Sequence, residues 1–352
     1  MPSSPPAAPP SSRHSGIENV EALTSETFWS PRALPDRLLV IGGGAVGCEL
    51  GQAMARLGSK VTLVHRGSRL APRESRRASA LLRATLEADD VDVRLNTSVE
   101  RFVSATEARL SDATSLAVDR VLVAVGKRPA TAGLGLAEAG VTTDERSRVL
   151  VDSSLRTSNP AIWAAGDVTP LPHFTHVAGV FGSLAGTNAV LGLRRSGDGA
   201  SIPRVLYTQP EIASVGVSPD DPEAEGCTVL AIDHEHLDRA VAEGRTSGFS
   251  ELVLDGRGRV RGASVVSPRA GETIAELTVA ITTGVSASTL GGIMHAYPGY
   301  SDGVYNTSIR QLQREFSGGA CGAAVQLLRR VTRARHRARE RLGGGADAPP
   351  RA

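Results

Sequence analysis

The sequence predicts an α/β chain that begins with a parallel, helix-covered sheet and ends with an α+β domain. A short apolar run at residues 38–41 is closed by three glycines and followed by apolar residues at helical spacing. Further apolar runs alternate with helical patterns to about residue 190, and this alternation implies parallel strands joined by right-handed crossovers. From Arg204 the pattern changes to the period-two alternation of antiparallel strands.

In detail, we expect the following order of elements. Strands lie at residues 38–41, 61–64, 91–95, 121–125 and 162–165, with helices at 47–57, 76–87 and about 175–191. The second domain has strands at 251–254 and 261–266, joined by a turn, and helices at 271–283 and 302–314. Before these elements, the Pro/Ser-rich residues 1–16 are expected to be disordered and 17–35 to form a linker. After them, residues 325–342 form a basic amphipathic stretch with seven arginines and one glutamate.

Composition fits a folded chain of two or three domains. A domain has roughly 100–200 residues, so a chain of 352 residues is long enough for two or three. Hydrophobic residues make up 41% of the chain, which is enough for a sizeable core. With 39 basic and 37 acidic residues, the chain has a net charge of +2. This value excludes a positive electrostatic field over the whole molecule that would attract nucleic acid or an anionic membrane. No run approaches the roughly 20 apolar residues of a membrane span. Three widely spaced cysteines form no disulfide framework, so we expect a cytoplasmic protein with no nucleic-acid partner and no stable membrane insertion.

The glycines after the first strand form a G-x-G-x-x-G pattern, with Gly42, Gly44 and Gly47 at the fixed positions. The first allows a tight turn, the second lets backbone amides approach a pyrophosphate, and the third lets the helix pack close to the sheet. The helix N-terminus adds partial positive charge for phosphates. The pattern therefore predicts a dinucleotide site, and the alternative is a glycine-rich turn without a ligand.

The end of the second strand favours NADP(H) over NAD(H). An NAD site would place Asp or Glu there to accept from the ribose 2′-hydroxyl. The sequence has His65 and Arg66 instead, with Arg69 just beyond, so cations stand where a 2′-phosphate would bind. The alternative is that these are ordinary surface arginines in an arginine-rich chain, and NAD remains possible.

At this point the chain resembles the FAD-dependent pyridine nucleotide–disulfide oxidoreductases, most closely the mercuric reductase-like and dihydrolipoamide dehydrogenase-like members. The resemblance runs from about residue 34 to 316. It rests on the order and spacing of motifs that include the glycine loop, VAVGKRP at 123–129, IWAAGDV at 162–168, YTQPEIASVG at 207–216, DRA at 238–240, and the pair Tyr297-Pro298.

The resemblance implies a Rossmann-like FAD/NAD(P)-binding domain of three layers (β/β/α) followed by an α+β dimerisation domain. The implied boundaries are a tail and linker at 1–33, the NAD(P)-binding domain at 34–128, the C-terminal part of the FAD-binding domain at 129–200, the dimerisation domain at 203–318 and a basic tail at 319–352. It also implies FAD as a cofactor and a homodimer.

The resemblance assigns a second group of residues to FAD and its nucleotide partner. Gly126 ends a strand near the cofactors, and Gly166 positions Asp167 to accept from a ribityl hydroxyl of the flavin. The following helix N-terminus would face the electron-rich edge of the flavin, and its residues are Phe174, Thr175 and His176. The alternative is that the Gly-Asp turn only caps that helix.

The family's His-Pro…Glu unit, which reaches into the partner's active site, is altered in this chain. Tyr297 stands before Pro298 and Asp302 at the Glu position, with His295 two residues earlier. Tyrosine is a poor general base near neutral pH because its ordinary pKa is about 10, although it can donate a hydrogen bond. Tyr297 and Asp302 are thus the implied catalytic positions, and His295 is expected to have no catalytic part.

Three features of the family are not found in the sequence. There is no earlier G-x-G-x-x-G and no C-x4-C pair, and Cys321 is single where mercuric reductases have a C-terminal cysteine pair. A thiolate–disulfide relay within this chain is therefore not expected. We expect weak FAD retention. The first functional hypothesis is hydride transfer from NADPH to flavin and on to an unknown small-molecule acceptor. The alternatives are an inactive, truncated nucleotide-binding and dimerising remnant, or a module whose basic tail binds a membrane surface or RNA.

Overall fold

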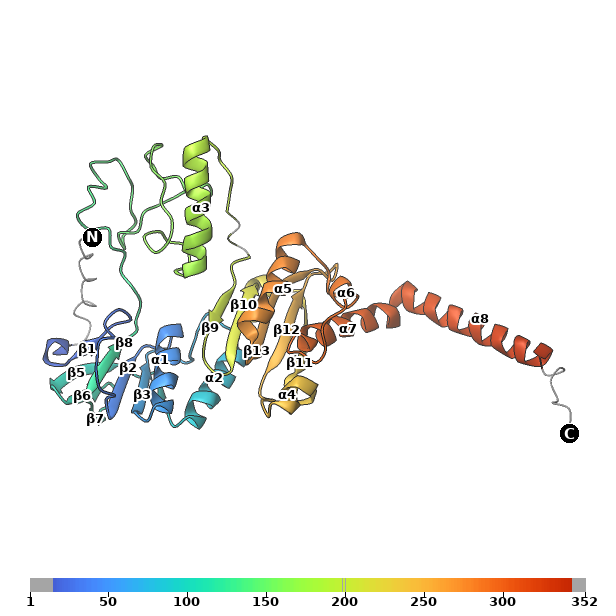
Figure 1. Cartoon of the computed structure of the whole chain (residues 1–352), viewed down its shortest axis with the longest axis horizontal. Coiled ribbons are helices and arrows are strands. Elements are labelled where there is room, and N and C mark those ends of the chain that lie inside the picture. The colour runs from blue at the N-terminus through green and yellow to red at the C-terminus, as the bar shows by residue number, and fades with distance from the viewer. Residues whose placement is uncertain (1–14, 198, 200, 344–352) are drawn as a thin grey trace. The chain divides into compact units, whose positions relative to one another are not determined.

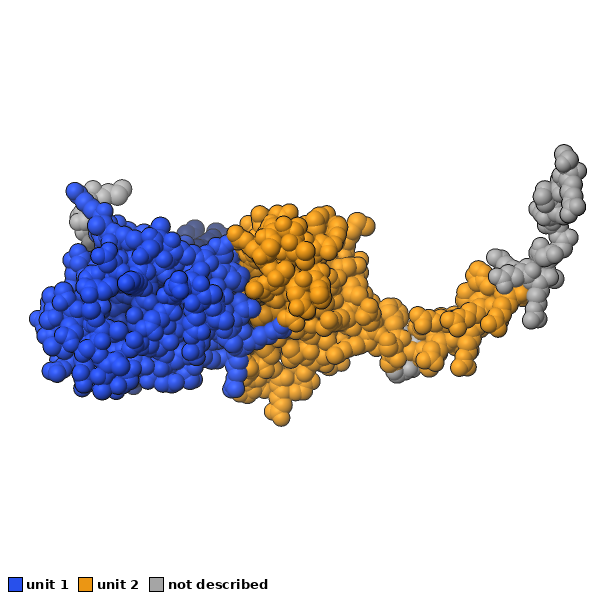
Figure 2. Space-filling view, turned by 90° about the horizontal axis from the view of Figure 1, so that it is seen from below, with its two compact units in different colours: residues 1–216 blue, residues 217–352 orange. Residues whose placement is uncertain are grey.

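The computed structural model describes residues 15–197, 199 and 201–343. The chain divides into two compact units, Met1–Gly216 and Val217–Ala352, which Figure 2 shows in different colours. Each unit is described by itself below. Among the described residues, no helix is both long enough and apolar enough to cross a membrane.

A parallel sheet forms the centre of the first unit (Figure 1). Its strands run in the order β1-β8-β2-β3-β4, and every neighbouring pair is parallel. Their bounds are β1 Ala22–Leu23, β2 Arg37–Ile41, β3 Lys60–His65, β4 Asp92–Leu95 and β8 Arg120–Val123. The helices α1 (Ala45–Arg56) and α2 (Arg76–Ala88) provide the crossovers. These elements agree with the strands and helices expected from residues 38–125.

The two faces of this sheet are covered by different layers. Gly51 of α1 lies near Val40 and Val61, so the helix covers the face on which those side chains point. On the other face, Leu39 and Ile41 join an apolar cluster with a small antiparallel sheet. That sheet consists of β5 (Val99–Ser104), β6 (Glu107–Leu110) and β7 (Ser115–Ala117). The predicted three-layer β/β/α arrangement is therefore confirmed, although the apolar pattern predicts no strand at residues 99–117.

The segment expected to be a linker contributes to this unit. A 3₁₀ turn at Ile17–Asn19 precedes β1, and Ala22 and Leu23 of β1 pair with Val121 and Leu122 of β8. Leu23 is buried. The linker prediction was wrong here. The strand β1 has two residues, which is enough to extend the edge of the sheet but too short to give a periodic apolar pattern in the sequence. Residues 1–14 of the predicted disordered tail lie outside the described part of the chain.

The helix α3 (Thr175–Leu191) has the bounds expected from the sequence. Its buried residues Val177, Phe181 and Ala185 pack with Leu155, Trp163 and their neighbours. The strand expected at residues 162–165 is not formed. Trp163 makes a single bridge to Arg156, and no described segment supplies the ladder that a central apolar strand needs. The first unit ends with an antiparallel pair, β9 (Arg204–Leu206) and β10 (Glu211–Gly216).

The second unit contains the antiparallel strands β11 (Thr228–Asp233), β12 (Phe249–Leu254) and β13 (Val260–Ser267). Every residue of β12 is buried. The alternation of apolar residues predicts β12, β13 and the turn between them. The helices are α4 (Asp238–Ala242), α5 (Ala270–Thr283), α6 (Ala287–Leu290) and α7 (Asp302–Ser317), followed by α8 (Gly319–Gly343); short 3₁₀ turns lie at Pro222–Ala224 and His234–His236. The predicted α+β character of this domain is confirmed.

Candidate functional site

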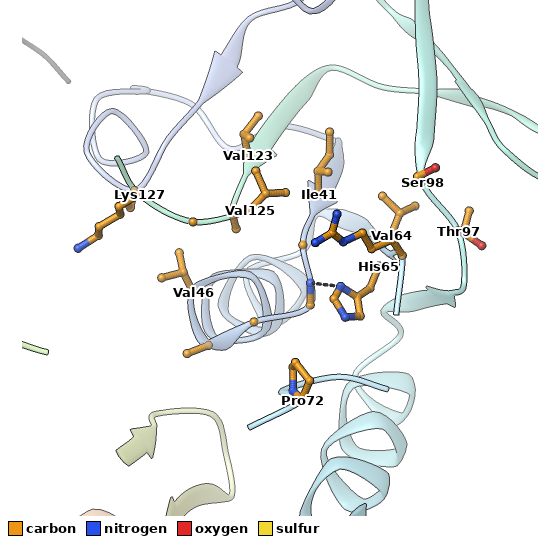
Figure 3. Close-up of a pocket in the computed structure, with 18 residues that line it drawn as sticks. Ile41, Val46, Val64, His65, Pro72, Thr97, Ser98, Val123, Val125 and Lys127 are labelled. Carbon is orange, nitrogen blue, oxygen red and sulfur yellow. Dashed lines mark hydrogen bonds between the residues drawn. The ribbon is translucent and has the colours of Figure 1, made fainter. Parts of the chain in front are cut away.

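A cavity of about 430 Å³ lies where β2, β3 and β8 end and α1 begins (Figure 3). Parallel strands place their carboxyl ends at one edge of the sheet, which is where ligands bind in open α/β folds. The glycine loop forms one wall. Val64 and His65 lie at the end of β3, and Val123, Val125 and Lys127 lie at or beyond the end of β8.

Each of the three motif glycines meets a different spatial requirement. Gly42 has φ +116°, and a Cβ there would lie 2.5 Å from the carbonyl oxygen of Ala124. A Cβ on Gly47 would overlap the carbonyl oxygen of Gly42, so this glycine permits the contact between helix and strand. A Cβ on Gly44 would meet no heavy atom within 4 Å. The open side of Gly44 is the place where a pyrophosphate can approach the backbone.

The N-terminus of α1 is suited to an anion. Gly44 is its N-cap residue, no side chain caps the helix, and no acidic residue lies in its first turn. The first amides of a helix have no partner within the helix, and they carry a partial positive charge. Backbone amides are thus available to phosphate at the cavity wall.

His65 is in the cavity but does not carry charge there. Its Nδ1 accepts a hydrogen bond of 3.2 Å from the backbone N–H of Gly43 (Figure 3). Burial lowers the pKa of the ring below its ordinary value, and the nearby Arg66 lowers it further. The ring is therefore neutral at pH 7 and fixes the glycine loop. It does not supply the positive charge that the sequence led us to expect.

The two arginines predicted to meet a 2′-phosphate have different positions. Arg66 lines the cavity and is exposed. Arg69 does not line it, because its guanidinium donates to the carbonyl oxygens of Pro72 at 2.7 Å and Glu74 at 3.1 Å. Arg69 holds the loop after β3, and of these two arginines it is Arg66 that faces the site.

Four polar cavity residues were not predicted as site residues. Ser25 follows β1, Thr97 and Ser98 follow β4, and Lys127 follows Gly126, which lines the cavity and has φ +118°. Thr97 and Ser98 could have been found from the rule that residues just after parallel strands meet at one edge of the sheet. Lys127 lies within the motif VAVGKRP at 123–129.

The Gly-Asp turn is connected to this edge by an ion pair. Lys127 Nζ lies 3.3 Å from Asp167 Oδ2, and both side chains are about half exposed. Gly166 has φ +79°, and a Cβ there would lie 3.2 Å from the Cβ of Ala178 in the first turn of α3. The N-cap of α3 is Phe174, and no side chain caps this helix. Asp167 therefore does not cap it, and its carboxylate remains accessible to a ligand hydroxyl.

The N-terminus of α3 presents two stacked rings. Phe174 and His176 have centroids 5.2 Å apart and planes inclined by 14°. His176 Nε2 lies 3.0 Å from the carbonyl oxygen of Pro203, which requires this nitrogen to be the donor. The first turn, which starts at Thr175, holds no acidic residue, so its amides can face an electron-rich group.

In the second unit, Tyr297 and Asp302 do not form a pair. The hydroxyl of Tyr297 donates to the carboxylate of Asp238, and this hydrogen bond raises the pKa of Tyr297 above its ordinary value. Asp302 is buried and accepts from the backbone N–H of Gly299 at 3.1 Å. Its role is to hold the turn after Pro298. His295 Nε2 lies 2.7 Å from Glu276 Oε1, so its side chain is tied to α5.

A parallel sheet with a glycine-loop cavity at the carboxyl ends of its strands and an uncapped helix N-terminus is the arrangement of the dinucleotide-binding fold class. Comparison with family models specifies the class. Residues 3–182 match the model described as pyridine nucleotide-disulphide oxidoreductase, and residues 202–307 match the dimerisation domain of the same family. The chain belongs to the pyridine nucleotide-disulphide oxidoreductase family.

Characterised relatives agree with this assignment. The chain is 38% identical over 300 residues to a mercuric reductase of Streptomyces lividans, covering 83% of this chain and 63% of the relative. It is 39% identical over 297 residues to a dihydrolipoyl dehydrogenase of Thermus scotoductus, covering 79% and 64%. The chain thus spans less than two thirds of the length of these relatives.

Solved structures show the same fold. The HOCl-induced flavoprotein disulfide reductase RclA from Escherichia coli matches with a TM-score of 0.79 and 27% identity, covering 86% of this chain and 71% of that one. LpdA from Mycobacterium tuberculosis matches with a TM-score of 0.77 and 27% identity, covering 82% and 64%.

Proposed function

We propose that the protein is an NADPH-dependent flavoprotein oxidoreductase that delivers reducing equivalents to a small-molecule acceptor. The observation that carries the proposal is the glycine-loop cavity, which combines an open Gly44, uncapped helix amides and the exposed cation Arg66. When bound, the nicotinamide and the flavin supply the hydride chemistry. The residues of the chain bind and orient the two cofactors.

The preference for NADPH rests on the chemistry at the end of β3. No carboxylate is present there to accept from a ribose 2′-hydroxyl, and His65 is held neutral by burial. In the described part of the chain, the guanidinium of Arg66 has no recorded ion pair, so it is available to a 2′-phosphate. NADH lacks this phosphate and would gain nothing from Arg66.

An Arg66→Gln variant tests this preference. We expect its dissociation constant for NADPH to rise about tenfold, with little change for NADH, because one charge-assisted hydrogen bond is lost. The measurement is titration of the nicotinamide fluorescence of each nucleotide. Arg101→Gln, which changes an exposed arginine of β5, is the matched control. Equal weakening of both nucleotides, or tighter NADH binding by the unaltered protein, would contradict the NADPH proposal.

The FAD site is proposed around Asp167 and the N-terminus of α3. The carboxylate of Asp167 would accept from a ribityl hydroxyl, and Lys127 beside it would balance its charge. The amides at Thr175 and His176 would face the electron-rich edge of the flavin, with Phe174 stacked on His176. Gly126 and Gly166 supply the left-handed backbone on either side of this arrangement.

The second candidate function is a nucleotide-binding and dimerising protein without turnover. One observation favours it: residues 162–165, an apolar strand in the sequence pattern, have no strand ladder within the described residues. A FAD site that depends on such a ladder would bind its cofactor weakly. Reduction of bound flavin by NADPH distinguishes the two candidates.

The partners and location are proposed from the family and the sequence. The dimerisation domain at residues 202–307 supports a homodimer. Tyr297 and Asp302 remain the proposed catalytic positions, with the hydroxyl of Tyr297 orienting the acceptor and Asp302 fixing the turn that presents it. We place the protein in the cytoplasm, with a small-molecule electron acceptor, no nucleic-acid partner and no stable membrane insertion.

A further inference from the structure

The helix α8 combines exposed cations with exposed apolar residues. It spans Gly319–Gly343, a length of about 37 Å at the rise of an α-helix. Every side chain from residue 326 to 338 is exposed. The match to the dimerisation domain ends at residue 307, so this helix lies beyond the part of the chain to which the family assigns a role.

Apolar side chains follow one stripe along this helix. Leu327, Val331, Ala334 and Ala338 are spaced by four, three and four residues, which places them on one face. Leu327 is 62% exposed and Val331 is 42% exposed. Exposure of such a stripe to water is unfavourable, so the stripe favours contact with an apolar phase.

Arginines border the stripe on both sides. Arg330 lies three residues after Leu327, and Arg335 lies four residues after Val331, on the opposite border. Arg329, Arg333 and Arg337 lie on the rest of the helix surface, together with Leu328, Thr332 and His336. Residues 319–338 include no acidic residue, and none of these five guanidinium groups has a recorded ion pair or hydrogen bond in the described part of the chain.

We propose that α8 is a docking helix for an anionic lipid surface, lying in the interface with the stripe toward the acyl chains. Arginine side chains at the borders of a stripe can extend their charged ends to lipid phosphates while their stems cover apolar surface. The same charges oppose pairing of two copies along α8, because arginines would face arginines. Nucleic acid would use the cations and leave the stripe in water. The charge pattern and the stripe together therefore fit a lipid surface.

Flotation of the full-length protein with lipid vesicles tests this proposal. We expect it to bind vesicles of phosphatidylglycerol and phosphatidylcholine at least about tenfold more tightly than phosphatidylcholine alone, with binding weakened by salt. A Leu327→Ser/Val331→Ser variant and an Arg330→Gln/Arg337→Gln variant should each lose about tenfold in vesicle affinity. Val103→Ser and Arg257→Gln, which alter exposed residues outside α8, should bind like the unaltered protein.

Four outcomes would overturn the proposal. The first is recovery of the protein only in the lipid-free fraction, and the second is vesicle binding by the Leu327→Ser/Val331→Ser variant that is as tight as that of the unaltered protein. Tight binding of a single-stranded RNA that this variant retains, without vesicle binding, would assign the helix to nucleic acid. A change in sedimentation caused by the same variant, without vesicle binding, would assign the stripe to a second copy of the chain. Circular dichroism of each variant shows whether α8 and the fold are retained.

Discussion

His65 and Arg66 are neighbours in the sequence, yet they contribute to the site in different ways. His65 accepts from the N–H of Gly43 and is neutral because it is partly buried beside a cation. Arg66 is exposed at the cavity and keeps its charge available. The sequence predicts both residues at the site, and both as cations. Burial and the tautomer of an imidazole depend on packing that no local pattern reveals.

The lowered pKa of His65 predicts a dependence of stability on pH. The unfolded chain binds a proton on this residue below about pH 6.5, whereas the folded chain resists it. The contribution to stability is thus fully present above that pH and is lost as the pH falls from it toward the lower folded pKa. We expect the free energy of unfolding, measured in urea, to decrease between pH 7 and pH 5.

His65→Asn is the matched variant for this experiment. Its amide oxygen can accept from the N–H of Gly43, and the side chain does not titrate. The decrease in unfolding free energy over the same pH range should be smaller than in the unaltered protein. An identical decrease in both proteins would show that other groups cause it.

At the scale of elements, most of the predictable structure is local. The apolar pattern predicts α3 with its observed bounds, and it predicts the positions of β2, α1, β12 and β13. Each of these elements buries one or both of its faces, so its apolar residues recur at a regular spacing. The strand β1 and the sheet β5–β6–β7 were not predicted. Their short strands carry little periodicity, and the sheet depends on contacts between residues such as Val99 and Leu110.

The strand expected at residues 162–165 failed for the opposite reason. Its apolar pattern is strong, but a strand exists only when another strand pairs with it, and the described residues provide one bridge from Arg156.

At the candidate site, the glycine loop and the Gly-Asp turn were predictable from motifs. Thr97 and Ser98 follow a predicted parallel strand, so the strand-end rule could have found them. The position of Arg69 was not predictable, because it depends on how the loop after β3 closes.

The glycine loop allows binding and folding to be separated by two substitutions. Gly44→Val places a side chain in open space at the cavity, so we expect at least about a tenfold loss of NADPH affinity with little change in unfolding free energy. Gly47→Val forces a side chain into the carbonyl oxygen of Gly42, so we expect destabilisation of about 2 kcal/mol or more. Nucleotide titration and urea unfolding of both variants are the measurements. Unchanged NADPH affinity in Gly44→Val would place the pyrophosphate elsewhere.

At the scale of the whole molecule, the dimerisation domain sets the expected state of assembly. Residues 202–307 match that domain, and the family site is proposed to include residues from a partner copy. Sedimentation velocity of the full-length protein should give a species of twice the 36.6 kDa chain mass. A monomer at all concentrations tested would remove Tyr297 and Asp302 from any site shared between copies.

The measurement that tests the proposed function most directly is the visible absorbance of the purified protein, before and after anaerobic addition of NADPH. With FAD supplied, we predict a flavin band that bleaches with NADPH faster than with NADH at equal concentration. A protein that remains colourless after incubation with FAD would contradict the flavoprotein proposal. It would leave a pyridine-nucleotide-binding protein without turnover.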